Sequence, residues 1–286
     1  GEDILTWDSP RLFREVAKHY EAALTERDRL LAIPLGDWAD LLDLGEMPHD
    51  YRPTLYDFLA FDAIDVYDAG EQLSVLPQDA FVLDVEGPVF GSADEFLGWS
   101  IEATDTDSPV YKGIKLLQEV MAVHRDDADR SAFYDANLRR LHFANVHAVG
   151  PGKTERYIAA LAEFAKGCEG HVIASRARAD WAQELLADDR PGEAHEVAKT
   201  GFGLHPDSPG GVQCFNLVKQ IERPSVAVST ERVWNAPWPD IAVDYKNLTD
   251  LHLRVVKLDW NERLSARDSY QPEHLNGRDI DALLAL

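Results

Sequence analysis

The chain has 286 residues, enough for one large domain or two ordinary ones. Its hydrophobic fraction of 45% is that of a globular protein, while 51 acidic against 28 basic residues give a formal net charge of −23. That charge repels nucleic acid and anionic membrane surfaces, so neither is an expected partner of this segment. Residues 1–10 lack the basic and apolar regions of a signal peptide, which fits either a cytoplasmic protein or the mature form of an exported one.

Helical signals dominate the chain up to about Leu217. Ser9 and Pro10 supply an N-cap and a proline at the first helical position, and they predict a helix over residues 10–31. Pro53 opens a second helix, which ends at Gly70. The apolar residues expected on the buried faces of these two helices are Leu12, Phe13, Val16, Tyr20, Ala23, Leu24, Leu55, Phe58, Leu59, Ile64 and Tyr67.

Between roughly residues 71 and 108 the periodicity fails, and we expect a loop with at most a single turn of helix. Further helices are predicted at about 110–124, 127–147, 154–166, 172–187, 193–204 and 209–221. In the second of these, Arg139 and Arg140 are expected on the exposed side.

The stretch "HAVGPGKTER", residues 147–156, contains Gly152-Lys153-Thr154, which is similar to the end of a phosphate-binding P-loop. A P-loop needs a glycine five residues before this core and a buried strand leading into it. His147 stands at the glycine position, and a helix rather than a strand leads in. We therefore interpret the stretch as a turn followed by a helix that Thr154 caps.

Small residues recur at a regular interval near the end of the helical region. Ala182, Ala194 and Pro206 are spaced twelve residues apart, with "DDRPGE" at the turn between two helices. This spacing resembles a tetratricopeptide (TPR) repeat, in which small residues let an antiparallel helix pair approach closely. One such match does not define an array, but it favours a TPR-like helical domain over residues 1–221.

The period changes after Ile221. Residues 224–230, 240–247 and 251–259 alternate apolar and polar side chains and contain β-branched residues, so we expect three strands of an antiparallel sheet. Three strands cannot close a β-sandwich, which needs about seven. Residues 222–286 are therefore expected to form an incomplete β domain with a helical or loop tail, at the front of a longer protein.

The acidic residues of the sequence do not have the spacing of a calcium-binding loop or of another metal site. Loops starting at Asp105 or Asp127 place Leu116 or Leu138 where a bidentate glutamate is needed. These acidic runs fit solvated loops and helix N-termini better. We therefore expect no metal ligands and no cofactor.

Nucleophile and base patterns are equally sparse. His142 and His147 are five residues apart, which places them on different faces of a helix, so we interpret them as structural. Cys168 follows a predicted helix, where its side chain could be exposed, but the sequence offers it no base, and the G-x-S-x-G pattern is missing. Cys168 and Cys214 fit two buried thiols better than a disulfide of an exported protein. The expectation is a protein with no catalytic residues and no enzyme activity.

Three stretches together resemble the N-terminal region of large bacterial alpha-2-macroglobulin-family proteins. They are "RPTLYDFLAFDAIDVY" (52–67), "HPDSPGGVQCFNLVKQIERPSVAVSTERVW" (205–234) and "VDYKNLTDLHLRVVKLD" (243–259). In that family a helical, TPR-like region precedes the first macroglobulin-type β-sandwich domain. The resemblance implies a mainly α TPR-like domain followed by a partial antiparallel macroglobulin-like β-sandwich.

The same resemblance implies an extracytoplasmic protein, periplasmic or at the cell surface and anchored in its full-length form, that acts as a protease trap. Its partners would be proteases, bound through the full-length protein, or another protein. The family's thioester pattern is Cys-x-Glu-Gln, and neither "CEGH" at Cys168 nor "CFNL" at Cys214 fits it. The function expected for this chain is a non-catalytic tethering or docking module of a protease inhibitor. The alternative is a TPR-type scaffold that binds a protein or peptide.

Overall fold

A computed structural model describes residues 4–42, 49–70, 80–231, 240–253 and 281. The described chain is mainly helical and also contains a two-stranded antiparallel sheet. It divides into two compact units, Gly1–Ile221 and Glu222–Leu286. The first unit holds the helices and the second holds the sheet.

Most α-helices follow the predicted ranges closely, but Asp8 rather than Ser9 is the N-cap of the first helix, and the short helix Ala93–Gly98 lies in the predicted loop. The α-helices are α1 (Ser9–Leu24), α2 (Arg27–Leu31), α3 (Leu55–Gly70), α4 (Ala93–Gly98), α5 (Pro109–Val123), α6 (Ser131–His147), α7 (Lys153–Gly167), α8 (Ile173–Ala187), α9 (Pro191–Leu204) and α10 (Pro209–Glu222). Short 3₁₀ turns lie at η1 (Ile4–Thr6), η2 (Leu35–Trp38), η3 (His49–Tyr51) and η5 (Pro88–Phe90).

The first predicted helix is interrupted. It ends at Leu24, where the Thr25 hydroxyl donates a hydrogen bond of 2.6 Å to the Ala22 carbonyl, and α2 begins at Arg27. Its buried side is Phe13 and Ala17, whereas Leu12 and Val16 are exposed, so the predicted face was partly wrong.

The buried face of α3 also differs from the prediction. Ile64 and Tyr67 are buried as predicted, but Leu55, Phe58 and Leu59 are only half-buried. Tyr56 and Phe61, which were not among the predicted positions, are fully buried on this helix together with Ile64. Because α3 is covered on more than one side, period alone does not select the buried positions.

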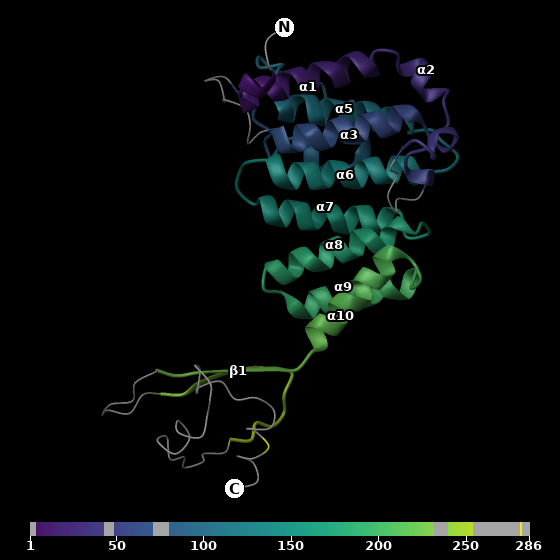
Figure 1. Ribbon diagram of the computed structural model, residues 1–286. Helices are drawn as coiled ribbons and strands as arrows, with labels where there is room; N and C mark the ends of the chain where they lie inside the picture. Colours follow the sequence, from purple (N-terminus) through teal and green to yellow (C-terminus); the bar gives the residue numbers. More distant parts are fainter. Residues whose placement is uncertain (1–3, 43–48, 71–79, 232–239, 254–280, 282–286) are drawn as a thin grey trace. The chain divides into compact units, whose positions relative to one another are not determined.

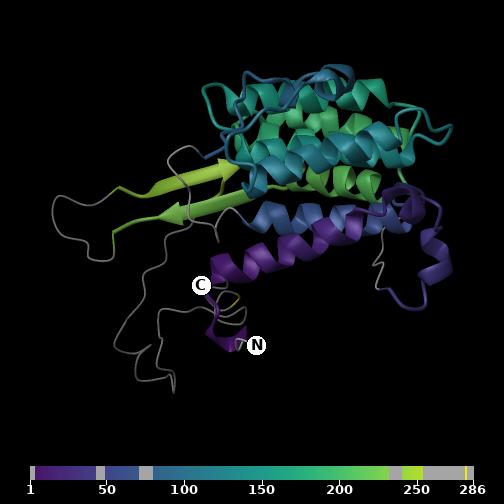
Figure 2. The same ribbon diagram turned by 90° about the horizontal axis from the view of Figure 1, so that it is seen from above.

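The helices of the first unit are stacked side by side. Figure 1 shows α1 at the top, then α3 and α5, which overlap in this view, and below them α6, α7, α8, α9 and α10. Seen from above, α1 (purple) lies alongside α3 (blue) (Figure 2). Neighbours in the chain are mostly neighbours in space, as in helical repeat proteins.

Helices α8 and α9 form the hairpin that the small-residue spacing predicted. Ala182, Ala194 and Ala198 are fully buried, which allows the two helices to approach closely. The turn between them contains Asp189 with φ 56°, and Pro191 opens α9. Helix α10 then packs against α8, where a Cβ built on Gly210 would lie 2.3 Å from the Arg176 backbone nitrogen.

Residues 80–108, before α5, form a connection that contains η5 and α4. Ser92 forms a capping box with Glu95 and starts the short α4. Residues 83–85 lie beside the turn after α6. The Val149 nitrogen donates to the Leu83 carbonyl (2.8 Å) and the Val85 nitrogen donates to the Val149 carbonyl (3.1 Å). This connection supplies one wall of a pocket discussed below.

The second unit contains β1 (Ser225–Ser229) and β2 (Ala242–Lys246), paired antiparallel with Val226 opposite Tyr245 and Val228 opposite Val243. These four side chains share one face of the hairpin, since directly opposite residues point the same way. Val226, Val228 and Tyr245 are exposed there. The other face carries small or polar side chains.

The third predicted strand is not formed where it can be checked. Residues 251–253 are described and belong to no strand, and residues 254–259 lie outside the described part. The predicted tail from residue 261 onwards also lies outside it, apart from Asp281.

Candidate functional site

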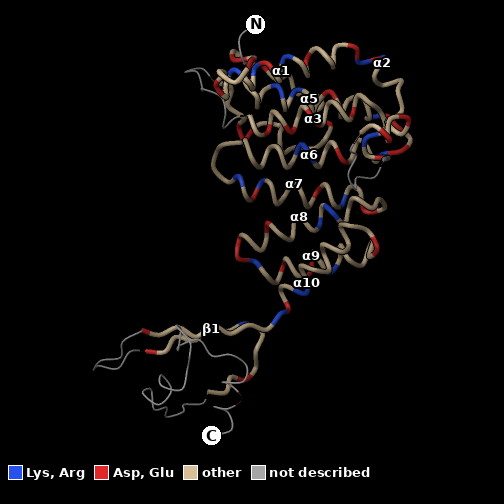
Figure 3. Tube along the Cα trace, in the orientation of Figure 1, with Lys and Arg blue, Asp and Glu red and all other residues tan. Residues whose placement is uncertain are grey.

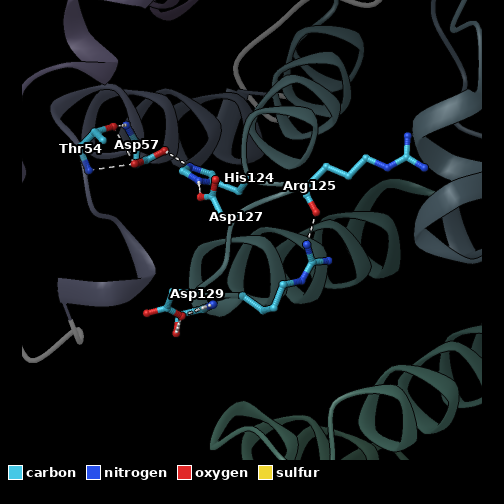
Figure 4. Close-up of polar contacts among 8 residues, drawn as sticks. Thr54, Asp57, His124, Arg125, Asp127 and Asp129 are labelled. Carbon is cyan, nitrogen blue, oxygen red and sulfur yellow. Dashed lines mark hydrogen bonds and ion pairs between the residues drawn. The ribbon is translucent and has the colours of Figure 1, made fainter.

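A buried histidine sits between two carboxylates at the end of α5 (Figure 4). His124 Nε2 lies 2.7 Å from Asp57 Oδ1, and His124 Nδ1 lies 2.7 Å from Asp127 Oδ2. Asp57 in turn accepts hydrogen bonds from the backbone nitrogen and hydroxyl of Thr54 (2.9 and 2.7 Å), which cap α3. The cluster therefore joins the start of α3 to the loop after α5.

The charge on His124 follows from these contacts. Burial lowers its pKa, but the hydrogen bonds and negative charges of Asp57 and Asp127 outweigh burial and raise the pKa above the ordinary value. Both ring nitrogens are engaged by carboxylates, so neither is free to take a proton from a nucleophile. The Thr54 hydroxyl lies on the far side of Asp57, the reverse of a catalytic triad. The arrangement is therefore suited to holding helices together.

A serine–histidine pair lies at the start of α6. Ser131 Oγ is 3.0 Å from His171 Nε2, and its hydroxyl also lies 2.6 Å from Asp129 Oδ1. His171 Nδ1 accepts the backbone N–H of Ile173 at 3.2 Å, so the neutral ring carries its proton on Nε2 and donates it to Ser131. Burial lowers the pKa of His171. A histidine in this tautomer cannot deprotonate the serine, so the pair does not activate a nucleophile.

Helices α3, α6 and α8 are joined by charged pairs along one side of the stack, which we name the α3–α6–α8 face. Arg139 of α6 binds Asp65 (2.7 Å) and Asp68 (2.8 Å) of α3. The side chains that define this face are Asp65, Asp68, Asp135, Arg139, His142, Arg176, Asp180 and Glu184. On α6 and α8 they recur three or four residues apart, which places them on one side of each helix.

The same face continues onto α8. His142 Nε2 lies 3.0 Å from Asp180 Oδ2, and Arg176 Nη1 lies 3.2 Å from Asp135 Oδ1. The side chains of Arg139, His142 and Asp180 remain 20–30% exposed, so water and a partner can still reach them.

This face carries more carboxylates than guanidinium groups. Burial and the nearby charge of Asp180 raise the pKa of Glu184, which shows that negative charge is crowded at this point. Both signs of charge are distributed along the whole stack rather than collected at one end (Figure 3). A positively charged partner would relieve the crowding at Asp180 and Glu184.

The residues singled out from the sequence are separated by the fold. His142 and His147 bind different carboxylates, Asp180 and Asp68, with His147 Nε2 at 2.6 Å from Asp68 Oδ1. Gly152, with φ 70°, is the N-cap of α7, so the predicted cap at Thr154 was wrong. A helix leads into this turn, and it lacks the strand of a P-loop.

Both cysteines are free and buried, so the prediction that Cys168 could be exposed was wrong. Cys168 Sγ lies 3.1 Å from the Phe164 carbonyl, and Cys214 Sγ lies 3.3 Å from the Ser175 carbonyl. Burial raises the pKa of each thiol to about 12. A protonated, enclosed thiol is a poor nucleophile.

Within the described ranges, no group of three or more His, Cys, Asp or Glu side chains is arranged to hold a metal ion. Helices long and apolar enough to cross a bilayer are likewise missing from this part of the chain.

The sequence reasoning missed one residue. Arg140 was predicted to be exposed, yet it is only 2% exposed and lines a pocket. The periodicity places Arg140 on one side of α6 with Phe133, Asn137 and Ala144, but no local pattern shows that this side is covered.

Comparisons with protein-family models, with curated proteins and with solved structures find no match to this chain.

Proposed function

We propose that residues 1–221 are a non-catalytic scaffold that binds another protein through the α3–α6–α8 face. The observation that carries this proposal is the row of charged pairs that links α3, α6 and α8, in which Arg139, His142 and Asp180 are partly exposed. Stacked helices of this kind present extended surfaces in repeat proteins. The hydrogen-bonding arrangements of His124 and His171 also supply no base for a nucleophile.

The charge of the face indicates its partner. Its carboxylates outnumber its guanidinium groups, and the whole chain carries −23. Complementary charge speeds association and suppresses wrong partners. The expected ligand is therefore a segment of another protein rich in lysine or arginine.

Charge reversal tests this proposal. The double variant Asp65→Lys/Glu184→Lys reverses charge on the α3–α6–α8 face, and Glu155→Lys/Glu196→Lys makes the same change at exposed positions of α7 and α9. A protein that is retained from the source cells by the wild-type chain and the control, but not by the face variant, supports the proposal. Equal retention by all three chains argues against binding at this face.

A second candidate is the front module of a protease trap, which the family resemblance suggests. It is favoured by the change from helices to an antiparallel hairpin directly after Glu222, with an apolar face that includes Val226 and Tyr245. This is the order of elements expected where a helical region meets a macroglobulin-type domain.

The trap hypothesis needs the full-length protein. We would mix it with a broad-specificity endoprotease and measure residual activity on a small chromogenic peptide and on a large protein substrate. Sparing of the large substrate with retained cleavage of the peptide supports a trap. Equal cleavage of both substrates removes this candidate and leaves the scaffold proposal standing.

A further inference from the structure

A small pocket lies on the other side of α6 from the α3–α6–α8 face. Its volume is about 200 Å³, and it is bounded by α6, α7 and the connection between η5 and α4. Its lining residues are Phe90, Gly91, Ser92, Ala93, Phe133, Tyr134, Asn137, Arg140, Ala160, Glu163, Phe164 and Gly167. Four of these residues are aromatic, namely Phe90, Phe133, Tyr134 and Phe164, and they give the pocket an apolar part.

The polar groups of this pocket are incompletely satisfied. Arg140 Nη2 donates to the Gly91 carbonyl at 3.0 Å, but Arg140 Nε and Nη1 and the Asn137 Oδ1 have no hydrogen-bond partner among the described residues. Buried polar atoms without a partner are uncommon, and each is costly. Such atoms gathered on two neighbouring side chains of one pocket indicate that a ligand supplies the missing partners.

The pocket is also electrostatically unusual. The Arg140 guanidinium lies 4.8 Å from the centre of the Phe96 ring and forms no ion pair with a described residue. Burial lowers the pKa of Arg140 to about 9, while the charges of Glu163 and Glu95 favour the protonated form. The group therefore remains positively charged at neutral pH. Glu163 is exposed at the pocket rim, where its carboxylate can accept a hydrogen bond.

We propose that this pocket binds an α-carboxylate with its neighbouring N–H group and an apolar side chain, as found in a free amino acid or at the C-terminus of a peptide. The carboxylate accepts hydrogen bonds from Arg140, and the N–H group donates to Asn137 or Glu163. The side chain of the ligand lies among Phe133, Phe164 and their neighbours.

The size of the pocket supports a ligand of this kind. The volume of about 200 Å³ is smaller than the roughly 300–1,000 Å³ of pockets that hold drug-sized ligands. One residue with its carboxylate matches this space. The two free Arg140 donors are shielded from solvent, so the guanidinium must turn to meet the ligand.

Titration of the purified chain tests the proposal by NMR chemical-shift changes and calorimetry. The probes are N-acetyl-L-leucine, its amide and free L-leucine. We expect saturable binding of the acid and at least about tenfold weaker binding of the amide, because a charge-assisted hydrogen bond is lost. Tighter binding of free leucine identifies a free amino acid as the ligand, and tighter binding of the acetylated form identifies a chain end. Equal affinity for acid and amide, or no saturation by either acid up to about 10 mM, overturns the proposal.

Three variants locate the binding site. Arg140→Met removes the cation, Ala160→Leu fills the pocket from α7 and keeps Arg140, and Arg156→Met removes an exposed cation of α7 that does not line the pocket. The first two should weaken N-acetyl-L-leucine binding at least about tenfold, and the third should leave it unchanged. Wild-type affinity in Arg140→Met overturns the assignment. If that variant does not fold, unchanged affinity in Ala160→Leu overturns it instead.

Discussion

His124 and Asp57 are hydrogen-bonded at 2.7 Å although 67 positions separate them in the sequence. Both side chains are almost completely buried, at 4% and 0% exposure. The bond joins the C-terminal end of α5 to the first turn of α3, and Asp127 completes it on the other ring nitrogen. The stability of the first unit is therefore coupled to the protonation of one histidine.

The first prediction concerns pH. Because the pKa of His124 is higher in the folded than in the unfolded chain, its contribution is fully present below the unfolded value of about 6.5 and is lost as pH rises through the folded value. We expect His124→Gln to lower the free energy of unfolding by about 3–5 kcal/mol at pH 6. Urea unfolding at a series of pH values measures this. The deficit of the variant should shrink towards alkaline pH.

Other groups titrate in the same range, so the difference between the two proteins is the informative quantity. His19→Gln serves as a control, since His19 is exposed and pairs only weakly with Glu15 at 3.5 Å. If the loss of unfolding free energy in His124→Gln does not depend on pH, the histidine stabilises the fold through packing and not through its charge.

The second prediction concerns the two thiols. With the pKa of Cys168 and Cys214 raised to about 12, roughly one thiol in ten thousand is ionised at pH 8. We expect negligible reaction with a disulfide reagent in the folded chain and rapid reaction of both thiols in denaturant. Absorbance of the released thiolate follows the reaction. Fast modification of either cysteine without denaturant would contradict the burial described above.

The third prediction uses two glycines. A Cβ on Gly210 meets the backbone of α8 at 2.3 Å, so Gly210→Ala must push α10 away and should cost about 1–3 kcal/mol. Gly203 in α9 has nothing within 4 Å of its Cβ position, and Gly203→Ala should stabilise the helix by about 0.5–1 kcal/mol. Thermal unfolding should move in opposite directions for the two variants. Equal shifts would mean that α8 and α10 are not in close contact.

The fourth prediction compares the adjacent arginines of α6. Arg140 carries unpartnered donors, so Arg140→Met should be neutral or stabilising by about 1–4 kcal/mol in the absence of ligand. Arg139→Met removes the ion pairs to Asp65 and Asp68, although Asp68 keeps His147, and it should destabilise the chain by about 1 kcal/mol. Denaturant midpoints measure both. Greater destabilisation by the Arg140 substitution would indicate that its two donors are satisfied in solution.

The fifth prediction concerns the hairpin. The face formed by Val226, Val228 and Tyr245 is exposed, and unpaired strand edges promote association. We expect the 286-residue chain to self-associate as its concentration rises, and Val226→Lys/Val228→Lys to reduce this in sedimentation velocity experiments. Ala227→Lys, on the opposite face, is the control. Similar association in all three chains would place the contact elsewhere.

Several helices were predicted well because capping residues or prolines mark their ends, and these local signals do not depend on the rest of the fold. The capping of α5 by Ser108 and the proline openings of α1 and α9 are fixed within a few residues of chain. The close packing of α8 against α9 could also be predicted, because the small side chains of Ala182 and Ala194 allow the two helices to approach each other.

Burial was harder to predict in the middle of the stack. Most residues of α6 are buried, and the charged Arg140 is among them, whereas the adjacent Arg139 stays partly exposed. Arg140 was assigned to solvent by its charge, but its true environment depends on Gly91 and Phe96, which lie more than forty positions away. The pocket and the bond between His124 and Asp57 share this dependence on distant partners, and no local pattern contains it.

The position of α6 has a mechanical consequence. It contacts α5 before it and α7 after it, and ion pairs link it to α3 and α8, so it connects the first helices of the stack to the last. In a linear stack, cooperativity passes only between neighbours. A destabilising substitution in α6 would therefore divide the unfolding transition into two steps, one for α1 to α5 and another for α7 to α10. A destabilising substitution in α1 would leave a single transition that involves fewer helices.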